Sequence, residues 1–349
     1  MALENELLKI KEKLSKEENS NVRVALFGQP GAGKSSILNK LIGNHVAVTG
    51  QRTDVTVKEE VYDWNGIHLV DLPGFGTKQF PKEGYFEKFK IETFDLFLCV
   101  FSGKFHQPDS EFFKEIKSRD KVCLFVRNKH DEIWEEGREL SELEEEILTD
   151  VKKQVNAEDI NVVFTSCRLN YGFDALQNLI LENLEPAKRE RWARGAKAYS
   201  VEFLENKRTA CKKYVYIAAG AAAANALNPI PGADIAVDLS VIATLFSSIR
   251  SSYGLTNEKL KSVEIALPTV APLANNIVKY AAKEGAIMLL KKFIGRQAVK
   301  QVSKYIPFVG QAVAASAGFA ITTAAGVSYL NDCHEVAKKV LENDLSRGK

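Results

Sequence analysis

The first half of the chain alternates between short apolar runs and segments of helical periodicity. The apolar runs predict strands over residues 22–27, 57–64, 67–71, 95–101, 121–127 and 161–165. Between them, helical spacing is clearest over residues 109–118 and 140–155. Alternation of this kind is typical of a mostly parallel sheet with helices on both faces. We therefore expect an α/β domain over residues 21–187.

A separate amphipathic pattern precedes the first strand. Leu3, Leu7, Ile10 and Leu14 recur at helical intervals among Lys and Glu, and residues 17–21 break the pattern. An amphipathic helix needs a partner for its apolar face. We expect residues 1–20 to pack against the C-terminal helices rather than against the sheet.

The second half of the chain has a different pattern. Beyond about residue 185 the apolar segments lengthen, alanine becomes abundant, and Gly and Pro separate the segments. This predicts an all-α domain over residues 188–349, which the N-terminal helix joins. Residues 227–233 and 305–311 are weakly alike, and one interpretation is a duplicated helical hairpin. A chain of 349 residues also favours two domains.

Two charge-free stretches, residues 214–233 and 305–331, are long enough to span a bilayer. Their small residues and internal prolines favour helices buried in a bundle, with bilayer insertion as the alternative. Residues 283–304 place basic side chains at every fourth position, namely Lys292, Arg296, Lys300 and Lys304. Such a helix suits an anionic membrane surface, or simply exposes its charged face to water.

Charge and cysteine content narrow the classes of function. Residues 1–187 carry a net charge of −9 and residues 188–349 one of +11. A basic half can contact acidic lipid, nucleic acid or an acidic part of the same molecule. Basic residues interleaved with aromatic ones are missing, so we expect no nucleic acid to bind. Five scattered cysteines and no secretory signal predict a reduced, cytoplasmic chain.

The chemistry begins at residues 28–35, which read Gly-Gln-Pro-Gly-Ala-Gly-Lys-Ser between a predicted strand and a predicted helix. This is the G-x-x-x-x-G-K-S pattern, in which backbone N–H groups surround phosphate, Lys34 reaches the β- and γ-phosphates and Ser35 binds Mg²⁺. A glycine-rich turn without a ligand is the weaker interpretation, because every fixed position is present. The candidate phosphate-binding residues are Gly28, Gly31, Gly33, Lys34, Ser35 and Ser36.

A second motif, Asp71-Leu72-Pro73-Gly74, ends a predicted strand about forty residues later. At that position Asp71 would hold Mg²⁺ through water, and the Gly74 N–H would meet the γ-phosphate. A switch threonine is expected between this strand and the phosphate loop, where Thr53 and Thr56 are available. We favour Thr56, which directly precedes strand 57–64. The candidate catalytic residues are Lys34, Thr56 and Gly74, and the candidate metal ligands are Ser35, Thr56 and Asp71.

The base-recognition motif follows the predicted strand 121–127. Asn128-Lys129-His130-Asp131 resembles the N-K-x-D motif of GTPases, in which the Asp carboxylate accepts from guanine N1–H and the exocyclic amine. Adenine lacks this pair of donors, so the motif predicts GTP and GDP as ligands. The Asn would support the loop and the Lys stem would cover the base. Thr165-Ser166-Cys167 resembles the last GTPase loop, which adds Ser166 and Cys167 to the site.

One position departs from the usual GTPase pattern. In many GTPases a Gln after D-x-x-G orients the attacking water, whereas this chain has Phe75. Catalysis would then need a main-chain carbonyl, the substrate's own phosphate, a loop residue such as Lys78, or a residue of a second subunit. We expect slow hydrolysis by a monomer and stimulation by self-assembly.

The stretch from residue 71 to residue 90, with residues 94–97 and 124–129, closely resembles the immunity-related GTPases. The resemblance covers residues 1 to about 195. It implies a Ras-like P-loop GTPase domain between an N-terminal helix and a C-terminal helical domain, dimerisation or oligomerisation on GTP, and action at membranes. Ala2 replaces the glycine that N-myristoylation requires. The C-terminal hairpins look more like a helical domain of bacterial membrane-associated GTPases.

These patterns together predict a GTP-binding and GTP-hydrolysing switch protein that self-associates and binds membranes peripherally. A membrane-inserted structural or channel-like protein regulated by GTP is the alternative. A small-molecule kinase is disfavoured by the guanine motif and by the lack of a recognisable acceptor site.

Overall fold

The computed structural model describes residues 2–43, 60–224, 228–229, 236–294 and 316–347. Two compact units divide the chain. The sheet unit is Asn21–Trp192, and the helical unit combines Met1–Ser20 with Ala193–Lys349. Each unit has a hydrophobic core of its own.

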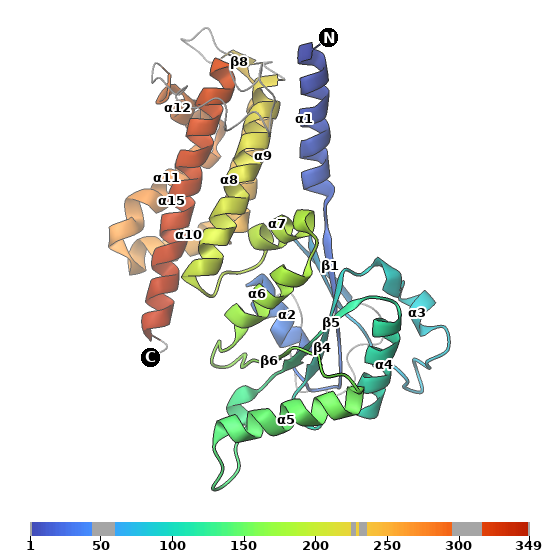
Figure 1. Ribbon diagram of the computed structural model, residues 1–349. Coiled ribbons are helices and arrows are strands. Elements are labelled where there is room, and N and C mark those ends of the chain that lie inside the picture. The colour runs from blue at the N-terminus through green and yellow to red at the C-terminus, as the bar shows by residue number, and fades with distance from the viewer. Residues whose placement is uncertain (1, 44–59, 225–227, 230–235, 295–315, 348–349) are drawn as a thin grey trace. The chain divides into compact units, whose positions relative to one another are not determined.

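The sheet unit is built on a six-stranded sheet with the order β2-β3-β1-β4-β5-β6 (Figure 1). Neighbouring strands are parallel except for the pair β2–β3. Asn65 and Gly66 join that pair, and both have positive φ angles, 51° and 75°, as the preferred two-residue hairpin turn requires. The strands are β1 Val22–Phe27, β2 Glu60–Trp64, β3 Ile67–Asp71, β4 Leu96–Phe101, β5 Val122–Arg127 and β6 Val162–Phe164.

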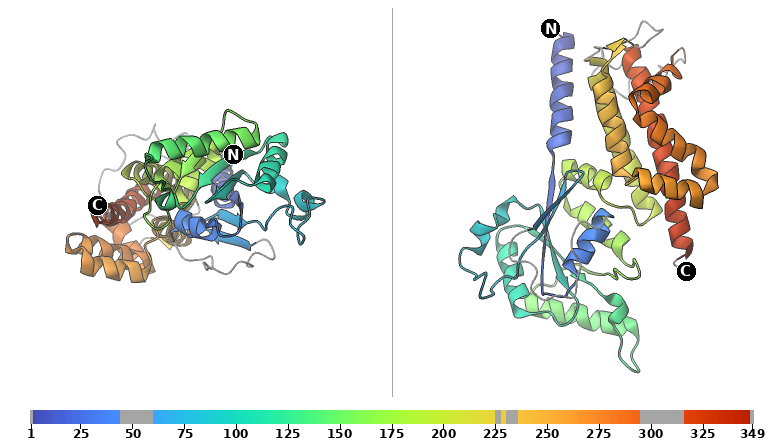
Figure 2. Two further views of the ribbon diagram at one scale, coloured as in Figure 1. Left: turned by 90° about the horizontal axis from the view of Figure 1, so that it is seen from below. Right: turned by 180° about the vertical axis from the view of Figure 1, so that it is seen from behind.

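Helices cover both faces of this sheet (Figures 1 and 2). α2 and α6 contact each other, and so do α4 and α5. The second pair closes an aromatic core in which Phe112 of α4 packs on Phe27 of β1, with ring centroids 4.2 Å apart. The helices of the unit are α2 Lys34–Ile42, α3 Tyr85–Lys88, α4 Gln107–Ser118, α5 Leu140–Val155 and α6 Phe173–Asn183. The next helix, α7 Pro186–Gly195, contains the boundary between the two units, after Trp192.

Strand order determines where a ligand can bind. After β1 the chain first forms β2 and β3 on one side of it and then β4, β5 and β6 on the other side, which makes the end of β1 a topological switch point. Ligands of open parallel sheets bind at such a point, outside the carboxyl ends of the strands. The segments that begin at Gly28, Asp71, Asn128 and Thr165 all lie at this edge, because each starts at or just after the end of a strand.

The helical unit is a bundle in which α8 and α15 run side by side (Figures 1 and 2). Its N-terminal helix packs on the same bundle, since Ile10 of α1 is buried against Ala219, Ala221 and Phe319. This confirms the partner expected for the first helix. The helices are α1 Ala2–Asn19, α8 Val201–Ala224, α9 Leu239–Ser252, α10 Asn257–Ala266, α11 Ala271–Ala281, α12 Lys283–Lys291 and α15 Ala317–Arg347.

Several expected boundaries differ from the structure. The first helix continues through Asn19, where we expected a break, because polar residues can extend an exposed helix and the Asn19 amide donates to Ser15 Oγ at 3.1 Å. The strand expected over 161–165 is shorter, Val162–Phe164, and β2 begins at Glu60, with residues 57–59 outside the described ranges. The strands expected over 95–101 and 121–127 each begin one residue later, at Leu96 and Val122, and β1 and β3 have the expected bounds.

Within the described residues, the region expected to be all-α contains one short pair of strands. β7 Asn228–Pro229 pairs antiparallel with β8 Ala236–Val237. Proline cannot continue a helix, and here the chain reverses between α8 and α9. The weak repeat at 227–233 and 305–311 falls largely or wholly outside the described residues.

The membrane-related expectations are tested in part. Ala218, Ala219 and Ala222 of α8 are buried in the bundle, as the small-residue pattern indicated. In the described part of the chain no helix has the length and apolar character needed to cross a bilayer. The basic helix expected over 283–304 is shorter, because α12 ends at Lys291, and residues 295–304 are outside the described ranges.

Candidate functional site

The phosphate loop connects β1 to α2 and depends on glycine for its shape. Gly28, Gly31 and Gly33 have φ angles of 133°, 80° and 93°. A Cβ atom on Gly33 would lie 2.2 Å from the Asn128 side-chain nitrogen, so any other residue there would have to displace the Asn128 side chain or the loop. Ser35 and Ser36 lie in the first turn of α2, whose N-terminal N–H groups are available to an anion.

Lys34 folds back over this loop. Its Nζ donates to the backbone carbonyls of Gly28 at 3.0 Å and Gln29 at 3.4 Å. Backbone carbonyls are neutral acceptors, and a phosphate is a far stronger partner for an ammonium group. The ammonium group of Lys34 is therefore held at the loop, where it can exchange these carbonyl oxygens for those of an anion.

Asp71 ends β3 beside the same loop. Its Oδ2 accepts from Ser35 Oγ at 3.3 Å, while its buried Oδ1 has no hydrogen-bond partner among the described residues. Burial raises the pKa of Asp71, and the charge of Lys34 and the Ser35 hydroxyl oppose this rise. A buried carboxylate oxygen without a partner is costly. An oxygen-binding cation such as Mg²⁺ fits this donor pair, a hydroxyl and a carboxylate.

Phe75 directly follows Gly74 and packs in an aromatic cluster. The Phe75 ring is 9% exposed and its centroid is 5.2 Å from those of Tyr85 and Phe112. The Tyr85 hydroxyl donates to the Pro73 carbonyl at 2.5 Å. The ring of Phe75 thus anchors this segment in the core and offers no polar group to water.

The base-recognition loop is joined to the phosphate loop by one side chain. The Asn128 amide donates to the Ala32 carbonyl at 2.8 Å, and its oxygen accepts from Thr165 Oγ1 at 3.3 Å. Asn128 and Thr165 are 2% and 0% exposed. Three loops that follow three different strands are therefore fixed to one another at the expected edge of the sheet.

Asp131 is held in place from two sides. Its Oδ1 accepts from Ser166 Oγ and its Oδ2 lies 2.9 Å from Arg168 Nε. The Ser166 hydrogen bond is the largest cause that lowers the pKa of Asp131, and a backbone hydrogen bond and the charge of Arg168 add to it, so the group is an anionic acceptor at neutral pH. This is the state that donors on a guanine edge require.

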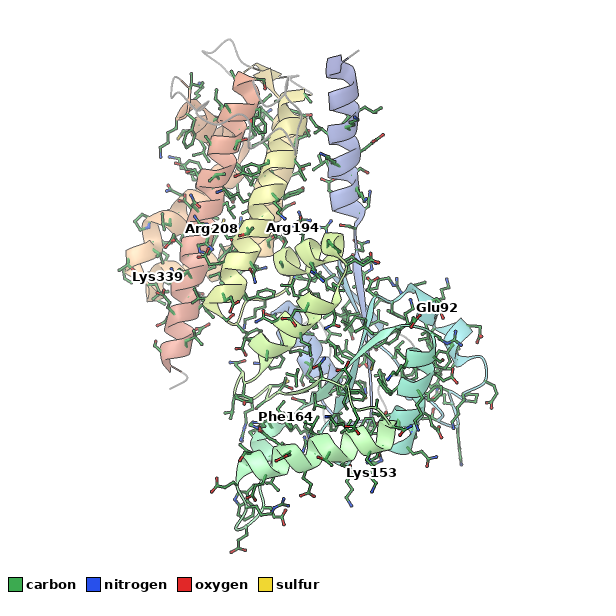
Figure 3. The ribbon with its side chains drawn as sticks, in the orientation of Figure 1. Glu92, Lys153, Phe164, Arg194, Arg208 and Lys339 are labelled. Carbon is green, nitrogen blue, oxygen red and sulfur yellow. The ribbon has the colours of Figure 1, made fainter. Side chains whose placement is uncertain are left out.

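His130 lies in the base-recognition loop, and its ring is held by two aromatic side chains and a carboxylate. Its ring stacks on Tyr171, with centroids 4.5 Å apart and an angle of 11°, and lies 5.8 Å from the ring of Phe164, labelled in Figure 3. Its Nε2 is 2.6 Å from a Glu144 carboxylate oxygen of α5. These contacts fix the backbone between Lys129 and Asp131.

The remaining predicted residues include Cys167, Lys129 and the two candidate switch threonines. Cys167 is half-buried, with its thiol 3.6 Å from Asn128 Oδ1, and burial raises its pKa to about 11. Lys129 is half-exposed and Lys78 is exposed. Thr53 and Thr56 lie outside the described residues.

The sequence analysis did not identify three neighbours of the loops: Gln29, Asp109 and Arg168. Gln29 lies at a variable position of the phosphate-loop motif, and Arg168 directly follows the Thr165-Ser166-Cys167 stretch, whereas Asp109 had no sequence signal.

The fold and the loops at its carboxyl edge define a P-loop protein of the GTPase class. The sequence model of the interferon-inducible GTPase family (IIGP) matches residues 2–343, and the chain belongs to that family. The resemblance inferred from the motifs is thereby confirmed. The match extends well beyond residue 195, where the sequence alone had ended the resemblance. It includes the C-terminal hairpins, which had looked more like a helical domain of bacterial membrane-associated GTPases.

Curated relatives agree with this assignment. Interferon-gamma-inducible GTPase 10 of Mus musculus is 26% identical over 70% of this chain and 63% of its own length. Interferon-inducible GTPase 1 of Mus musculus is 30% identical over 72% and 66%. Interferon-inducible GTPase 5 of Bos taurus is 23% identical over 95% and 77%. The matches to the two mouse proteins span less than two thirds of those proteins.

Among solved structures, a probable GTP-binding protein, engB, is similar to 46% of this chain over 98% of its own length. The two have a TM-score of 0.36 and 20% sequence identity. The Era protein of Aquifex aeolicus is similar to 56% of this chain over 66% of its own length, with a TM-score of 0.36 and 22% identity.

Proposed function

We propose that this protein binds and hydrolyses GTP and works as a nucleotide-dependent switch. The observation that carries the proposal is a hydrogen bond from the Asn128 side-chain amide to the Ala32 carbonyl at 2.8 Å. This bond joins the base-recognition loop to the phosphate loop. One ligand that spans both loops must have a phosphate at one end and a base at the other. Family membership supports the same proposal.

Guanine specificity would come from Asp131. The Ser166 hydroxyl and Arg168 keep its carboxylate anionic and oriented, and guanine supplies the two adjacent N–H donors that it needs. Adenine would leave this carboxylate without those donors, which is a large cost for an oriented charged group. ATP should therefore bind much more weakly than GTP.

Phosphate and Mg²⁺ binding would use the other loop. Lys34 would exchange its carbonyl partners for the β- and γ-phosphates, and the loop N–H groups would surround the β-phosphate. Ser35 and Asp71 would hold Mg²⁺, with Thr56 as the proposed third ligand. When bound, the ion would neutralise charge that develops between the β- and γ-phosphates. The Gly74 N–H would contact the γ-phosphate.

Hydrolysis by a single copy is expected to be slow. Phe75 occupies the position of the usual water-orienting Gln, and its ring is buried among aromatic side chains. We propose that self-association in the GTP state supplies or orients the missing group. A turnover rate per molecule that rises with protein concentration supports this proposal, and a constant rate from nanomolar to micromolar protein contradicts it.

The base assignment can be tested by exchanging donors and acceptors. Asp131→Asn replaces an acceptor with a donor, so it should lose most GTP binding and gain xanthosine triphosphate, which has a carbonyl where guanine has its amine. Competition against a fluorescent GDP analogue measures both effects. Asp174→Asn, an exposed carboxylate on α6, is the control. Unchanged preference for GTP in Asp131→Asn would rule out the assigned role.

We also propose peripheral association with anionic membranes, supported by the +11 charge of residues 188–349 and by exposed Lys291 and Lys292 at the end of α12. Vesicles containing phosphatidylserine should carry the protein in flotation, and neutral vesicles should not. Lys291→Glu with Lys292→Glu should reduce recovery. Equal recovery with both kinds of vesicle would contradict an electrostatic contact.

A further inference from the structure

A buried carboxylate beside the phosphate loop has no role in the scheme above. Asp109 lies in the first turn of α4 and is 5% exposed. Its Oδ2 accepts from the side-chain amide of Gln29 at 3.0 Å. Gln29 is the second residue of the phosphate loop, directly after Gly28. The contact therefore joins the loop to a helix that is remote from it in sequence.

The same helix contacts the other side of the site. Phe112, one turn after Asp109, packs on Phe27 at 4.2 Å and on Phe75 at 5.2 Å between ring centroids. Phe27 directly precedes the phosphate loop, and Phe75 directly follows Gly74. The first two turns of α4 thus contact the start of the phosphate loop and the end of the Asp71–Gly74 segment. A shift of α4 would move both.

We infer that Asp109 is a positioning residue that holds the phosphate loop in its binding conformation through Gln29. The inference rests on the proposed nucleotide-binding function. The inference assigns Asp109 no contact with the phosphates, only its contact with Gln29. The effect of that contact is to fix the Gln29 side chain, so that the loop N–H groups converge before a ligand arrives. Binding then requires less ordering of the loop.

A purely electrostatic role makes the opposite prediction. Burial raises the pKa of both Asp71 and Asp109, and the charge of Lys34 opposes the rise at each carboxyl group. If the charge of Asp109 were what mattered, it would repel a triphosphate and compete for Lys34. Removing that charge would then strengthen binding. If positioning matters, removing the acceptor must weaken binding, and the charge is dispensable.

Two substitutions separate these roles. Asp109→Ala removes the acceptor, and we expect about tenfold weaker binding of GDP and of a GTP analogue alike, because the loop surrounds the β-phosphate that both carry. Asp109→Asn keeps an acceptor oxygen for Gln29 without the charge, and its affinities should stay within about twofold of wild type. Hydrolysis at saturating GTP should also change less than twofold in both variants.

A double-mutant cycle shows whether Asp109 acts through Gln29. Gln29→Ala should weaken binding about as much as Asp109→Ala, and the double variant should be no weaker than either single one. Glu111→Ala is the matched control, because Glu111 lies on the same helix, is paired with Lys82 at the surface and should leave affinity unchanged. Thermal unfolding of each ligand-free variant identifies any that fail to fold.

The outcomes distinguish the inference from the proposed function. A wild-type protein that binds neither GDP nor GTP analogue contradicts the proposed function itself. Wild-type binding with unchanged affinity in Asp109→Ala overturns the inference alone. Tighter binding by Asp109→Asn favours the electrostatic role, and additive losses in the double variant show that Asp109 does not act through Gln29.

Discussion

The two units place buried polar groups under different conditions. In the sheet unit, the buried Asp71 Oδ1 has no partner among the described residues, and Lys34 binds neutral carbonyls of its own loop. In the helical unit, Lys207 is 1% exposed, and its ammonium donates to the carbonyls of Arg194 and, at 2.8 Å, of Ser252. The first arrangement leaves polar groups for a ligand, whereas the second uses them internally.

The partners of Lys207 explain how a lysine can be buried in a bundle. Arg194, labelled in Figure 3, lies in the last turn of α7, and Ser252 ends α9. Carbonyls at helix C-termini have no intrahelical donor and carry partial negative charge. One side chain of α8 thus caps two helix ends. Burial still lowers the pKa of Lys207 to about 7.

The largest effect on the nucleotide loops of the sheet unit is expected from Gly33→Ala. The new Cβ would meet the Asn128 amide at 2.2 Å, at a φ of 93° that side chains disfavour. Crowding by the new Cβ should cost about 1–3 kcal/mol, and the left-handed backbone conformation about 1–2 kcal/mol. Relief of this strain would move the phosphate loop away from Asn128. We expect nucleotide affinity to fall by about a hundredfold to a thousandfold, as isothermal titration can measure.

Gly137→Ala is a suitable comparison for that variant. Gly137 also has a positive φ, 77°, but it is exposed, and a Cβ added to it would have no atom within 4 Å. It should bind nucleotide like the wild type. Equal losses from both substitutions would mean that general backbone strain, rather than the contact with Asn128, governs binding.

The second prediction concerns Lys207 of the helical unit. In the folded chain Lys207 loses its proton near pH 7, whereas in the unfolded chain it does so near pH 10.5. Between these values the unfolded state binds more protons, so stability should rise with pH, by at most about 1.4 kcal/mol per unit. Urea unfolding between pH 7 and pH 9 should show this rise, and Lys207→Met should lack it.

Lys212→Met serves as the matched control, because Lys212 lies on the same helix and is exposed. It should keep the wild-type dependence on pH. A Lys207→Met protein whose stability changes with pH as the wild type does would show that Lys207 remains charged through this range. Its overall stability is a separate matter, since the substitution also leaves two helix ends uncapped.

Local patterns in the sequence were enough for most of the sheet unit. The strands β1 and β3 and the helix α5 have the bounds that the sequence predicted, since apolar runs and helical spacing act over a few residues. The phosphate and guanine loops were recognisable because their chemistry restricts residue type at fixed spacing. Placement of these residues at one edge followed from the rule for parallel sheets.

Contacts distant in sequence could not be predicted in the same way. Gln29 and Asp109 are 80 residues apart, and nothing in either neighbourhood marks them as a pair. Lys207 lies in the stretch Glu205-Asn206-Lys207-Arg208, which is indistinguishable in pattern from an exposed helical face. Its burial depends on where α7 and α9 end in space. The Asn65-Gly66 turn is the opposite case, because two adjacent residues fix it.

The smallest expected effect is on stability and comes from a glycine at a helix end of the helical unit. Gly254 follows α9 with a φ of 61°, and no atom lies within 4 Å of a Cβ placed there. Gly254→Ala should cost about 1 kcal/mol of stability through backbone strain alone, and Gly254→Asn less, because asparagine tolerates this conformation. Nucleotide affinity should be unchanged in both, since the strain falls on a helix end of the helical unit and the nucleotide loops belong to the sheet unit. Denaturant midpoints resolve the stability difference. If Gly254→Asn were as unstable as Gly254→Ala, the requirement at this position would be for the absence of a side chain rather than for the left-handed conformation.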